Sequence, residues 1–265
     1  MNSNSLLRIV IIGTGQLAGH LALTFMGAGH TIVQIVGRNS EKTKQLAENL
    51  ALGFVLSFDE IDTDADVYLL AVSDDAIAEV VEKLPVLKGI CVHASGSIGM
   101  DVFKDKFTSF GVFYPLQTFS QGRFIDFQGV PIFIEANSPI CKGILFLLAN
   151  SISGDVVEVC SEDRRKLHLA AVFVSNFVNA LFSMGNEILH NTNLSFELLK
   201  PLILETVYKA FETDPESSQT GPAKRGDKGT MHAHLNLLNN KPELARLYDQ
   251  FSKYISTKYN VKDYE

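Results

Sequence analysis

Continuous apolar runs alternate with segments of helical spacing through the first half of the chain. Residues 6–12 form an apolar run that holds one charge, which is typical of a strand buried on both faces. Residues 21–28 have helical spacing, and Gly29 ends that segment. Further strands are predicted over 31–36, 66–72, 89–94, 109–114 and 129–136, and helices over 40–51 (N-cap Ser40) and 74–84. This alternation predicts an α/β fold with a doubly wound, mainly parallel sheet.

The pattern changes after residue 160, where we find no convincing strand. Helical spacing covers residues 162–189, 195–212 and 241–256. Residues 213–230 are polar and hold two prolines and three glycines, which predicts a loop between helices. We therefore expect an α/β domain over residues 1–158, followed by an all-helical domain over residues 159–265.

A glycine-rich turn joins the first predicted strand to the first helix. Residues 13–18 read GTGQLA and match the pattern GxGxxA. The first glycine allows the tight turn, the second lets the backbone approach a pyrophosphate, and the alanine keeps the helix close to the strand. The helix N-terminus offers free N–H groups and a positive dipole end to the anion. This context predicts dinucleotide binding rather than an ordinary glycine turn, with these contact residues: Gly13, Thr14, Gly15, Gln16 and Leu17.

The end of the second predicted strand indicates which dinucleotide binds. An NAD site carries Asp or Glu there for the ribose 2′-hydroxyl, whereas an NADP site lacks the acid and supplies Arg. This chain has Arg38, Asn39 and Ser40 at that place, and its first acid, Glu41, comes a turn later. Arg38 can hold a 2′-phosphate with its planar guanidinium, and its two neighbours can donate hydrogen bonds. NADP(H) is therefore favoured over NAD(H); the alternative is that Arg38 is a solvated surface arginine.

The third long strand ends in Ala71, Val72 and Ser73. The carboxyl ends of such strands line the cofactor crevice of a doubly wound sheet, so we expect the backbone of these residues beside the cofactor. We interpret Asp74 and Asp75 as first-turn acids of the following helix rather than as catalytic groups.

Composition and charge exclude several kinds of partner. With 23 Lys and Arg against 30 Asp and Glu, the net charge of −7 disfavours non-specific nucleic-acid binding. The longest apolar stretch, 167–184, contains five polar residues, so we expect a helix buried in protein rather than a membrane span. Three widely spaced cysteines and no recognisable targeting segment indicate a cytoplasmic protein. His232 and His234 lack a third ligand nearby, and no metal site is expected.

Several motifs together resemble one family. They are GTGQLA at 13–18, GRNS at 37–40, HASGS at 93–97, YPLQTF at 114–119, the helical stretch 168–179 and TGPAKRGD at 220–227. The chain thereby resembles NADP-dependent oxidoreductases that join a Rossmann-like domain to a helical C-terminal domain of unknown function. These are distant relatives of pyrroline-5-carboxylate reductase and of the 6-phosphogluconate dehydrogenase superfamily. The resemblance covers nearly the whole chain. It implies a two-domain fold, NADP(H) as the cofactor and a homodimer through the helical domain, but it names no substrate.

The resemblance also implies candidates for the chemistry at the sheet edge. In the related dehydrogenases a serine-containing turn lies beside the nicotinamide and the substrate, so Ser95 and Ser97 are candidates to bind a substrate carbonyl or carboxylate. The alternative is an ordinary polar turn. His93 is interpreted as a packed histidine. Tyr114 can donate a proton or stack on the nicotinamide, although a core tyrosine with a satisfied hydroxyl is favoured.

The long helix after residue 160 supplies the candidate acid. His168, Val172 and Asn176 are spaced to share one stripe of an α-helix, with Asn179 next along the helix. The relatives place a lysine or polar residue and an asparagine on this helix, facing the nicotinamide. Here no lysine has that spacing, since Lys166 lies off the stripe. His168 is then the available general acid, with a packing histidine as the alternative.

Two functions remain open at this point. The first is an NADP(H)-dependent oxidoreductase that moves hydride between nicotinamide and a C=O or C=N group of a small substrate. Lys224 and Arg225, in a segment that reaches the active site in the reductase relatives, suggest an anionic substrate, unless they form a surface loop paired with Asp227. The second is a non-catalytic NADP(H)-binding regulator or sensor, which the missing lysine keeps open. NADPH oxidation assays with keto acids, imines and aldehydes separate the two.

Overall fold

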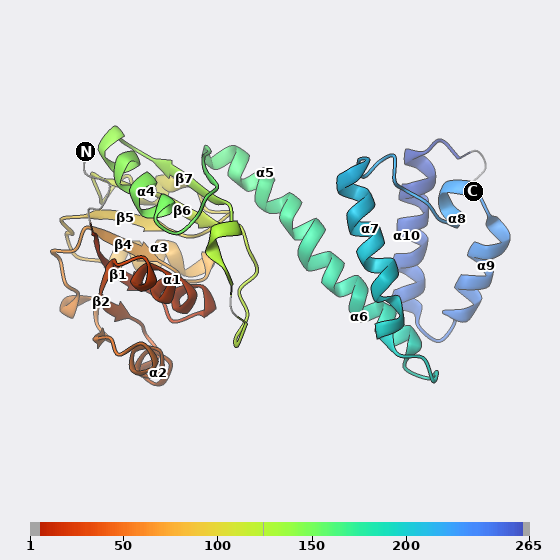
Figure 1. The fold of residues 1–265 in the computed structure, drawn as a ribbon, viewed down its shortest axis with the longest axis horizontal. Coiled ribbons are helices and arrows are strands. Elements are labelled where there is room, and N and C mark those ends of the chain that lie inside the picture. The colour runs from red at the N-terminus through yellow and green to blue at the C-terminus, as the bar shows by residue number, and fades with distance from the viewer. Residues whose placement is uncertain (1–5, 124, 262–265) are drawn as a thin grey trace. The chain divides into compact units, whose positions relative to one another are not determined.

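The computed structural model describes residues 6–123 and 125–261, and contacts within it divide the chain into two compact units, Met1–Phe173 and Val174–Glu265. The first unit holds an eight-stranded sheet with the order β3-β2-β1-β4-β5-β6-β7-β8 (Figure 1). The strands are β1 Arg8–Ile12, β2 Thr31–Val36, β3 Phe54–Val55, β4 Val67–Leu70, β5 Ile90–His93, β6 Phe110–Pro115, β7 Ile132–Ala136 and β8 Val156–Glu158. Its helices are α1 Gln16–Gly27, α2 Ser40–Leu50, α3 Asp74–Lys83, α4 Pro139–Asn150 and α5 Ser161–Ala171.

The chain winds outward from β1 in both directions. It passes through β2 to β3 on one side, returns to β4 on the other side of β1, and continues to β5 and β6. These pairs are all parallel, whereas β7 runs antiparallel to β6 and parallel to β8. The predicted α/β class, doubly wound and mainly parallel, is confirmed. The switch in winding direction between β1 and β4 is where such sheets form a ligand crevice.

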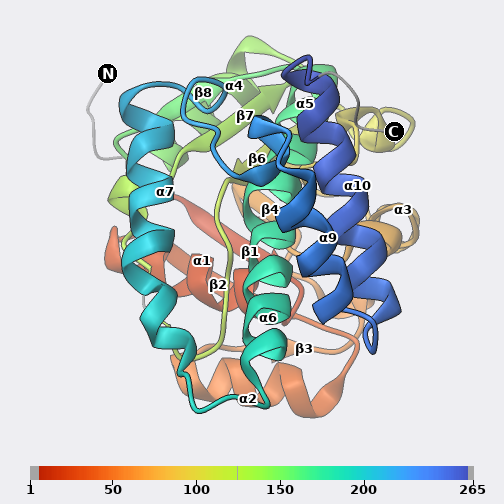
Figure 2. The same cartoon turned by 90° about the vertical axis from the view of Figure 1, so that its right-hand side faces the viewer.

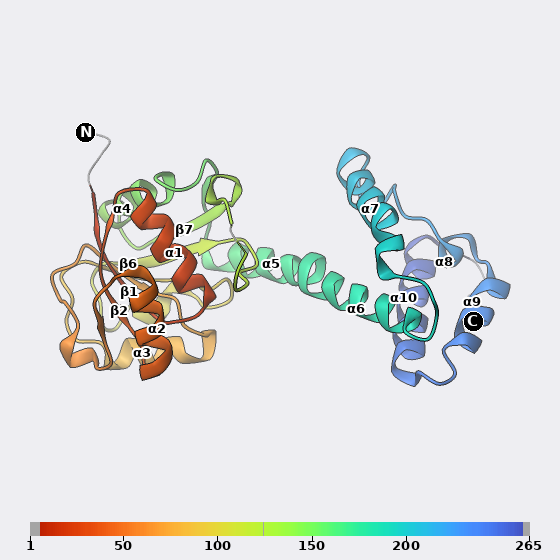
Figure 3. The same ribbon diagram turned by 60° about the horizontal axis from the view of Figure 1, so that its bottom comes forward.

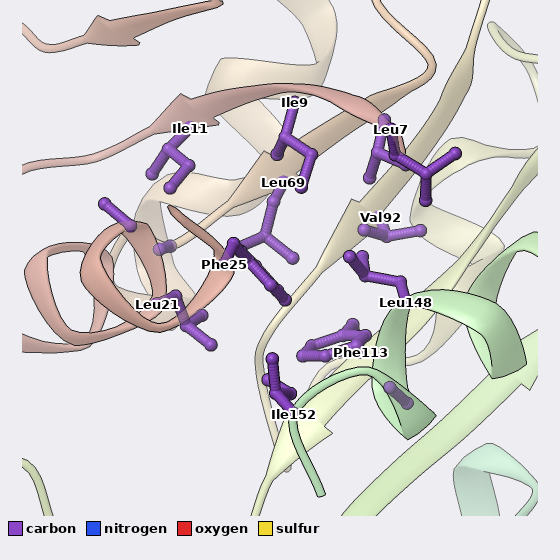
Figure 4. Packing of buried hydrophobic residues seen from close by; sticks show 14 of the residues in the cluster. Leu7, Ile9, Ile11, Leu21, Phe25, Leu69, Val92, Phe113, Leu148 and Ile152 are labelled. Atoms are coloured by element: carbon purple, nitrogen blue, oxygen red, sulfur yellow. The ribbon is translucent and has the colours of Figure 1, made fainter. Parts of the chain in front are cut away.

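Helices cover both faces of the sheet because the strand residues are apolar on both sides. Ile9 and Ile11 pack into one cluster with α1 and α4, which Figure 4 shows around Phe25, Phe113 and other buried side chains. Val10 and Ile12 point the other way and pack with α3. Successive strand residues face opposite sides, so a continuous apolar run feeds two core layers at once.

The second unit is helical. Its helices are α6 Phe177–Leu189, α7 Lys200–Glu212, α8 Pro222–Arg225, α9 Lys228–Leu237 and α10 Pro242–Lys258, and the part that the structure describes contains no strand (Figure 2). The short α8 packs against α9 and α10 (Figure 3). The predicted helical C-terminal region is confirmed. The division at 173/174 falls within the long helix rather than at the expected joint, because α5 packs on the first unit; the domain boundary at 158/159 stays a prediction.

Several predicted details of the elements are wrong. Asn39, not Ser40, caps α2, since its side chain accepts the N–H of Lys42. The expected loop 213–230 contains α8 and the start of α9. A proline begins α8, and the side chain of Asp227 caps α9. The short strands β3 and β8 and the helix α4 were not anticipated. The pair Ser138 and Pro139, a cap and a first-turn proline, signals α4.

The apolar helix Ser161–Leu189 is long and apolar enough to cross a membrane by composition alone, which is weak evidence by itself. Within the described residues, none of its most apolar window is buried. We expected this stretch to be buried in protein, but the described residues of the single chain do not bury it. The helix is also irregular, because Val172–Asn176 form a π-helical turn. A π turn widens the helix locally, so the stripe expected from regular α-helical spacing does not run unbroken to Asn176.

Candidate functional site

The glycine turn after β1 lies between the ends of two neighbouring strands. Gly13 has φ of +130°, and a Cβ there would collide with the carbonyl oxygen of Ala71 at the end of β4. Its N–H donates to the carbonyl oxygen of Val36, at the end of β2, at 2.8 Å. Only glycine accepts this conformation together with this close approach. The predicted role of Gly13 in the tight turn is what the geometry requires.

The N-terminus of α1 is free to bind an anion. Its N-cap is Gly15, which has no side chain to occupy the first N–H groups, and its first turn carries no acid. A Cβ at Gly15 would meet nothing within 4 Å, so open space lies in front of the backbone. By contrast, the side chain of Asn39 caps α2. The unsatisfied N–H groups and the dipole of α1 therefore face a cavity, as a pyrophosphate site requires.

That cavity has a volume of about 310 Å³. Eight predicted cofactor residues line it: Gly13, Thr14, Gly15, Arg38, Asn39, Ala71, Val72 and Ser73. Gln16 instead lines an adjoining cavity of about 730 Å³, and Leu17 and Ser40 line neither. Seven further lining residues were not among the predicted contacts: Ile12, Val36 and Gly37 at the strand ends, and Lys42, Leu56, Phe58 and Val80. Lys42 lies in the first turn of α2, and a second cation so close to Arg38 could have indicated a phosphate contact from the sequence. The apolar lining residues carry no such signal.

Arg38 lies exposed at the cavity, and its Nη1 is 3.4 Å from Oε2 of Glu79 on α3. A hydrogen bond from Lys83, with the charges of Lys83 and Arg38, holds the pKa of the Glu79 carboxyl below its usual value. Exposed ion pairs of this kind contribute little to stability, so the guanidinium of Arg38 can leave Glu79 and bind an anionic ligand instead. The side chain of Asn39, in contrast, already serves as the α2 cap.

A polar turn follows β5 at the same edge of the sheet. The Oγ of Ser95 accepts the N–H groups of Ser97 and Ile98 at 3.1 and 3.0 Å, and Ser97 donates its hydroxyl to Asp74. His93 is fully buried, accepts the N–H of Ser95 and stacks on Phe103. Burial lowers the pKa of His93 to about 4. His93 is thus a packed neutral histidine, as interpreted, and Ser95 shapes the turn.

Tyr114 and His168 meet at this turn. The hydroxyl of Tyr114, at the end of β6, is 2.9 Å from Nδ1 of His168 on α5, and the rings meet edge to face. Tyr114 is buried and His168 is half-buried. Burial, with the charge of Asp74, raises the pKa of the Tyr114 phenol, which keeps it protonated. The sequence offered both residues as separate candidates but gave no sign of their contact.

A buried ion pair fixes the start of α5. Arg164, one helical turn before His168, is fully buried and pairs with Glu135 of β7. Its Nη2 also donates to the carbonyl oxygen of Ile98 at 2.5 Å, and Ser161 donates to Glu135 at 2.6 Å. The helix that carries His168 is therefore anchored both to the sheet and to the Ser95 turn. Sequence reasoning missed Arg164, which looked like one more charge on a polar first turn.

Two family models match the chain: "NADP oxidoreductase coenzyme F420-dependent" over residues 8–92 and "domain of unknown function (DUF2520)" over residues 130–255. The structure of a "putative NADP oxidoreductase" from Bacteroides fragilis is 37% identical, with a TM-score of 0.90, over 95% of this chain and 98% of its own. This chain belongs to that family of Rossmann-like oxidoreductases. The resemblance seen in the sequence is confirmed, and the protein is accordingly a nicotinamide-dependent oxidoreductase.

More distant structures share the fold. A reductive aminase from Aspergillus terreus is 13% identical, with a TM-score of 0.72, over 97% of this chain and 95% of its own. A 1-pyrroline-5-carboxylate reductase from Streptococcus pyogenes is 15% identical, with a TM-score of 0.59, over 95% of this chain and 99% of its own. A search of curated proteins found no match.

The remaining candidates are described within the unit that holds each of them. Lys166 is exposed and paired with Glu162 and Asp163, which agrees with its place off the expected stripe. In the second unit, Lys224 donates to the carbonyl oxygen of Gln219 at 2.7 Å and lies over the ring of Tyr259. Among the described residues no group of three or more His, Cys, Asp or Glu could hold a metal ion. Asn176 lies in the π turn, and its catalytic role stays a prediction.

Proposed function

We propose that the protein is an NADP(H)-dependent oxidoreductase that moves hydride between nicotinamide and a C=O or C=N group of a small, anionic substrate. The observation that carries the proposal is the cavity in front of α1, where an uncapped helix N-terminus and open space at Gly15 adjoin Arg38. The 37% identical relative described as an NADP oxidoreductase supports it. The reductive aminase of the same fold was solved with NADPH, which supports NADP(H) as the cofactor.

The residues present fit such a cofactor. The N–H groups of α1 would hold the pyrophosphate, and Arg38 with Lys42 would hold the 2′-phosphate, since no acid ends β2. Leu56, Phe58 and Val80 would flank the adenosine with apolar surface. When bound, the nicotinamide supplies or accepts the hydride, while the protein contributes orientation and a proton.

Three residues carry the proposed chemistry. Ser95 keeps the turn after β5 in shape and stands beside the substrate. His168 supplies the proton, because histidine is the residue type that most readily gains and loses one near neutral pH. Asn176 is proposed to hydrogen-bond the substrate. The cations Lys224 and Arg225 support an acidic group on the substrate.

Arg38→Ala tests the cofactor assignment. NADPH affinity should fall tenfold or more, about 1.4 kcal/mol, while NADH affinity stays nearly unchanged, because only NADPH carries the 2′-phosphate. Calorimetric titration measures both. Lys44→Ala, which removes an exposed cation of α2 outside the cavity, is the matched control and should change neither affinity. Equal losses for both cofactors in Arg38→Ala would contradict the 2′-phosphate role.

The alternative, a regulator that binds NADP(H) without turnover, rests on the absence of a lysine at the expected helix position. The contact between Tyr114 and His168 favours the enzyme, because it provides a proton-transfer pair where a binding protein needs none. Oxidation of NADPH with pyruvate, 1-pyrroline-5-carboxylate and succinic semialdehyde tests this. Tight binding without turnover on any of them would favour the regulator.

We also propose that the protein is a cytoplasmic homodimer assembled through the helical unit. In the described chain, α6 and α7 bury no residue, although Leu198, Leu202 and Phe211 on or beside α7 are large and apolar. An uncovered apolar surface of this kind is typical of an interface between subunits. A second copy supplies the same surface, and an isologous contact would cover both.

A further inference from the structure

The contact between Tyr114 and His168 depends on a single glycine. A Cβ built on Gly96 would lie 2.6 Å from Nδ1 of His168 and 2.8 Å from Cζ of Tyr114. Real Cβ atoms do not approach other heavy atoms so closely, so any side chain at this position would displace one ring or both. By contrast, a Cβ on Gly99, three residues later in the same segment, would first meet Oγ of Ser161 at 3.7 Å. Gly96 therefore has a steric requirement specific to this pair.

Contacts connect the pair to the cofactor cavity. Ser73 lines the cavity, and the next residue, Asp74, accepts the hydroxyl of Ser97. Ser97 in turn hydrogen-bonds Ser95, which precedes Gly96. Asp74 also acts on the phenol of Tyr114 through its charge. The phenol thus stands at the same edge of the sheet as the end of β4, where a reacting carbon held beside the cofactor would lie.

We propose that Tyr114 is the residue that exchanges a proton with the substrate, that His168 resupplies it, and that Gly96 is the positioning residue that lets the two rings meet. This assignment rests on the proposed oxidoreductase function and replaces direct donation by His168 with a two-step relay. His168 is half-buried and can exchange protons with water, whereas Tyr114 is buried beside the turn.

Protons balance in both the reduction and the oxidation of the substrate. In reduction, with NADPH as the reductant, the substrate oxygen or nitrogen takes the phenol proton, and the O–H electron pair stays on Tyr114. The imidazolium of His168 then donates its Nδ1 proton to the phenolate, and water reprotonates the imidazole. In oxidation each transfer runs backwards. The charged groups that act on Tyr114 are Asp74 at the start of α3 and Arg164 on α5, and the uncharged ring of Phe133 packs against it from β7.

Tyr114→Phe is the direct test, because it keeps the ring and removes only the hydroxyl. With whichever substrate of the panel the wild type reduces, kcat should fall about a hundredfold or more, the usual size of a general-acid contribution. KM and the calorimetric NADPH affinity should stay within about threefold, as for a residue that acts only during the proton transfer. His168→Asn keeps a hydrogen-bonding group near the Nδ1 position but cannot pass a proton to the phenolate, so kcat should fall while KM changes little.

Gly96→Ala and Gly99→Ala form a matched pair. In protein carrying ¹⁵N-labelled histidine and no cofactor, the ring signals of His168 should move in Gly96→Ala and Tyr114→Phe and stay in place in Gly99→Ala. Of the two glycine variants, only Gly96→Ala should lose activity. Unchanged melting temperatures and circular dichroism establish that the variants are folded.

The outcomes separate this inference from the function beneath it. A wild type that reduces a substrate while Tyr114→Phe keeps more than a third of its kcat overturns the relay and leaves the oxidoreductase standing. Unmoved His168 signals in Tyr114→Phe overturn it as well. A wild type that oxidises NADPH with none of the substrates overturns the proposed function, and the relay with it.

Discussion

The two units of this chain bury their apolar residues to very different degrees. In the first unit both faces of the sheet are covered, and strand residues such as Ile9 and Val10 are fully buried. In the second, the described residues after Val174 that reach burial are Ala223, Met231, Leu238, Ser252 and Ser256. Since burial of apolar area is the main favourable term in folding, the first unit carries its own stability, whereas the second depends on further cover.

The largest expected effect concerns the buried ion pair of the first unit. Arg164→Met leaves the carboxylate of Glu135, whose side chain is only 12% exposed, without its charged partner and should destabilise the protein by about 3 kcal/mol or more. Urea unfolding measures the loss, which should not depend on protein concentration. Lys166→Met, which removes an exposed pair of the same helix, serves as the control and should change stability little. A small loss in Arg164→Met would show that the first unit is less self-contained than its burial indicates.

The next largest effect is a pH dependence of the free energy of unfolding of the first unit. Burial lowers the pKa of His93 in the folded protein from its ordinary value of 6.5 to about 4. Between these values the unfolded chain binds more protons, so stability falls as pH falls from 6.5 towards 4, by about 3 kcal/mol in all. Urea unfolding at several pH values measures this. His93→Asn, which can still accept the N–H of Ser95, should remove this part of the dependence; an unchanged slope would assign it to other groups.

The second unit should respond to association instead. The native mass is expected to be twice the chain mass of 29.2 kDa. Leu202→Glu places a charge on an exposed apolar position of α7 and should weaken the dimer roughly a hundredfold, about 2.8 kcal/mol. Light scattering across a dilution series measures both. Lys44→Glu, on the surface of the first unit, should leave the mass unchanged. A wild type that is monomeric at high concentration would contradict the dimer.

The smallest effect is local to the first unit. Asn39→Ala removes the side chain that caps α2 and should cost about 1 kcal/mol. Ser40→Ala, at the position that the sequence favoured as the cap, should cost less. Thermal or urea unfolding compares the two variants. A larger loss in Ser40→Ala would restore the cap predicted from the sequence.

The features that could be predicted from the sequence are those that a few adjacent residues indicate. The glycine turn, the buried strands and the absence of an acid at the end of β2 each depend on a few adjacent residues, and each was found. The contact between Tyr114 and His168 joins residues 54 positions apart, and the pair of Arg164 with Glu135 joins residues 29 apart. No local pattern marks such contacts, because the packing of α5 on the sheet creates them. Leu56 and Phe58 were missed for a related reason, since they follow a two-residue strand that is too short to show alternation.

The proposed function depends above all on the binding of a phosphorylated nicotinamide dinucleotide at the turn between β1 and α1. Calorimetric titration of the purified protein with NADPH, and separately with NADH, tests it most directly. We expect saturable heat with NADPH and weaker binding of NADH, because Arg38 and Lys42 line the cavity that would hold the 2′-phosphate. The absence of heat with both dinucleotides would contradict it.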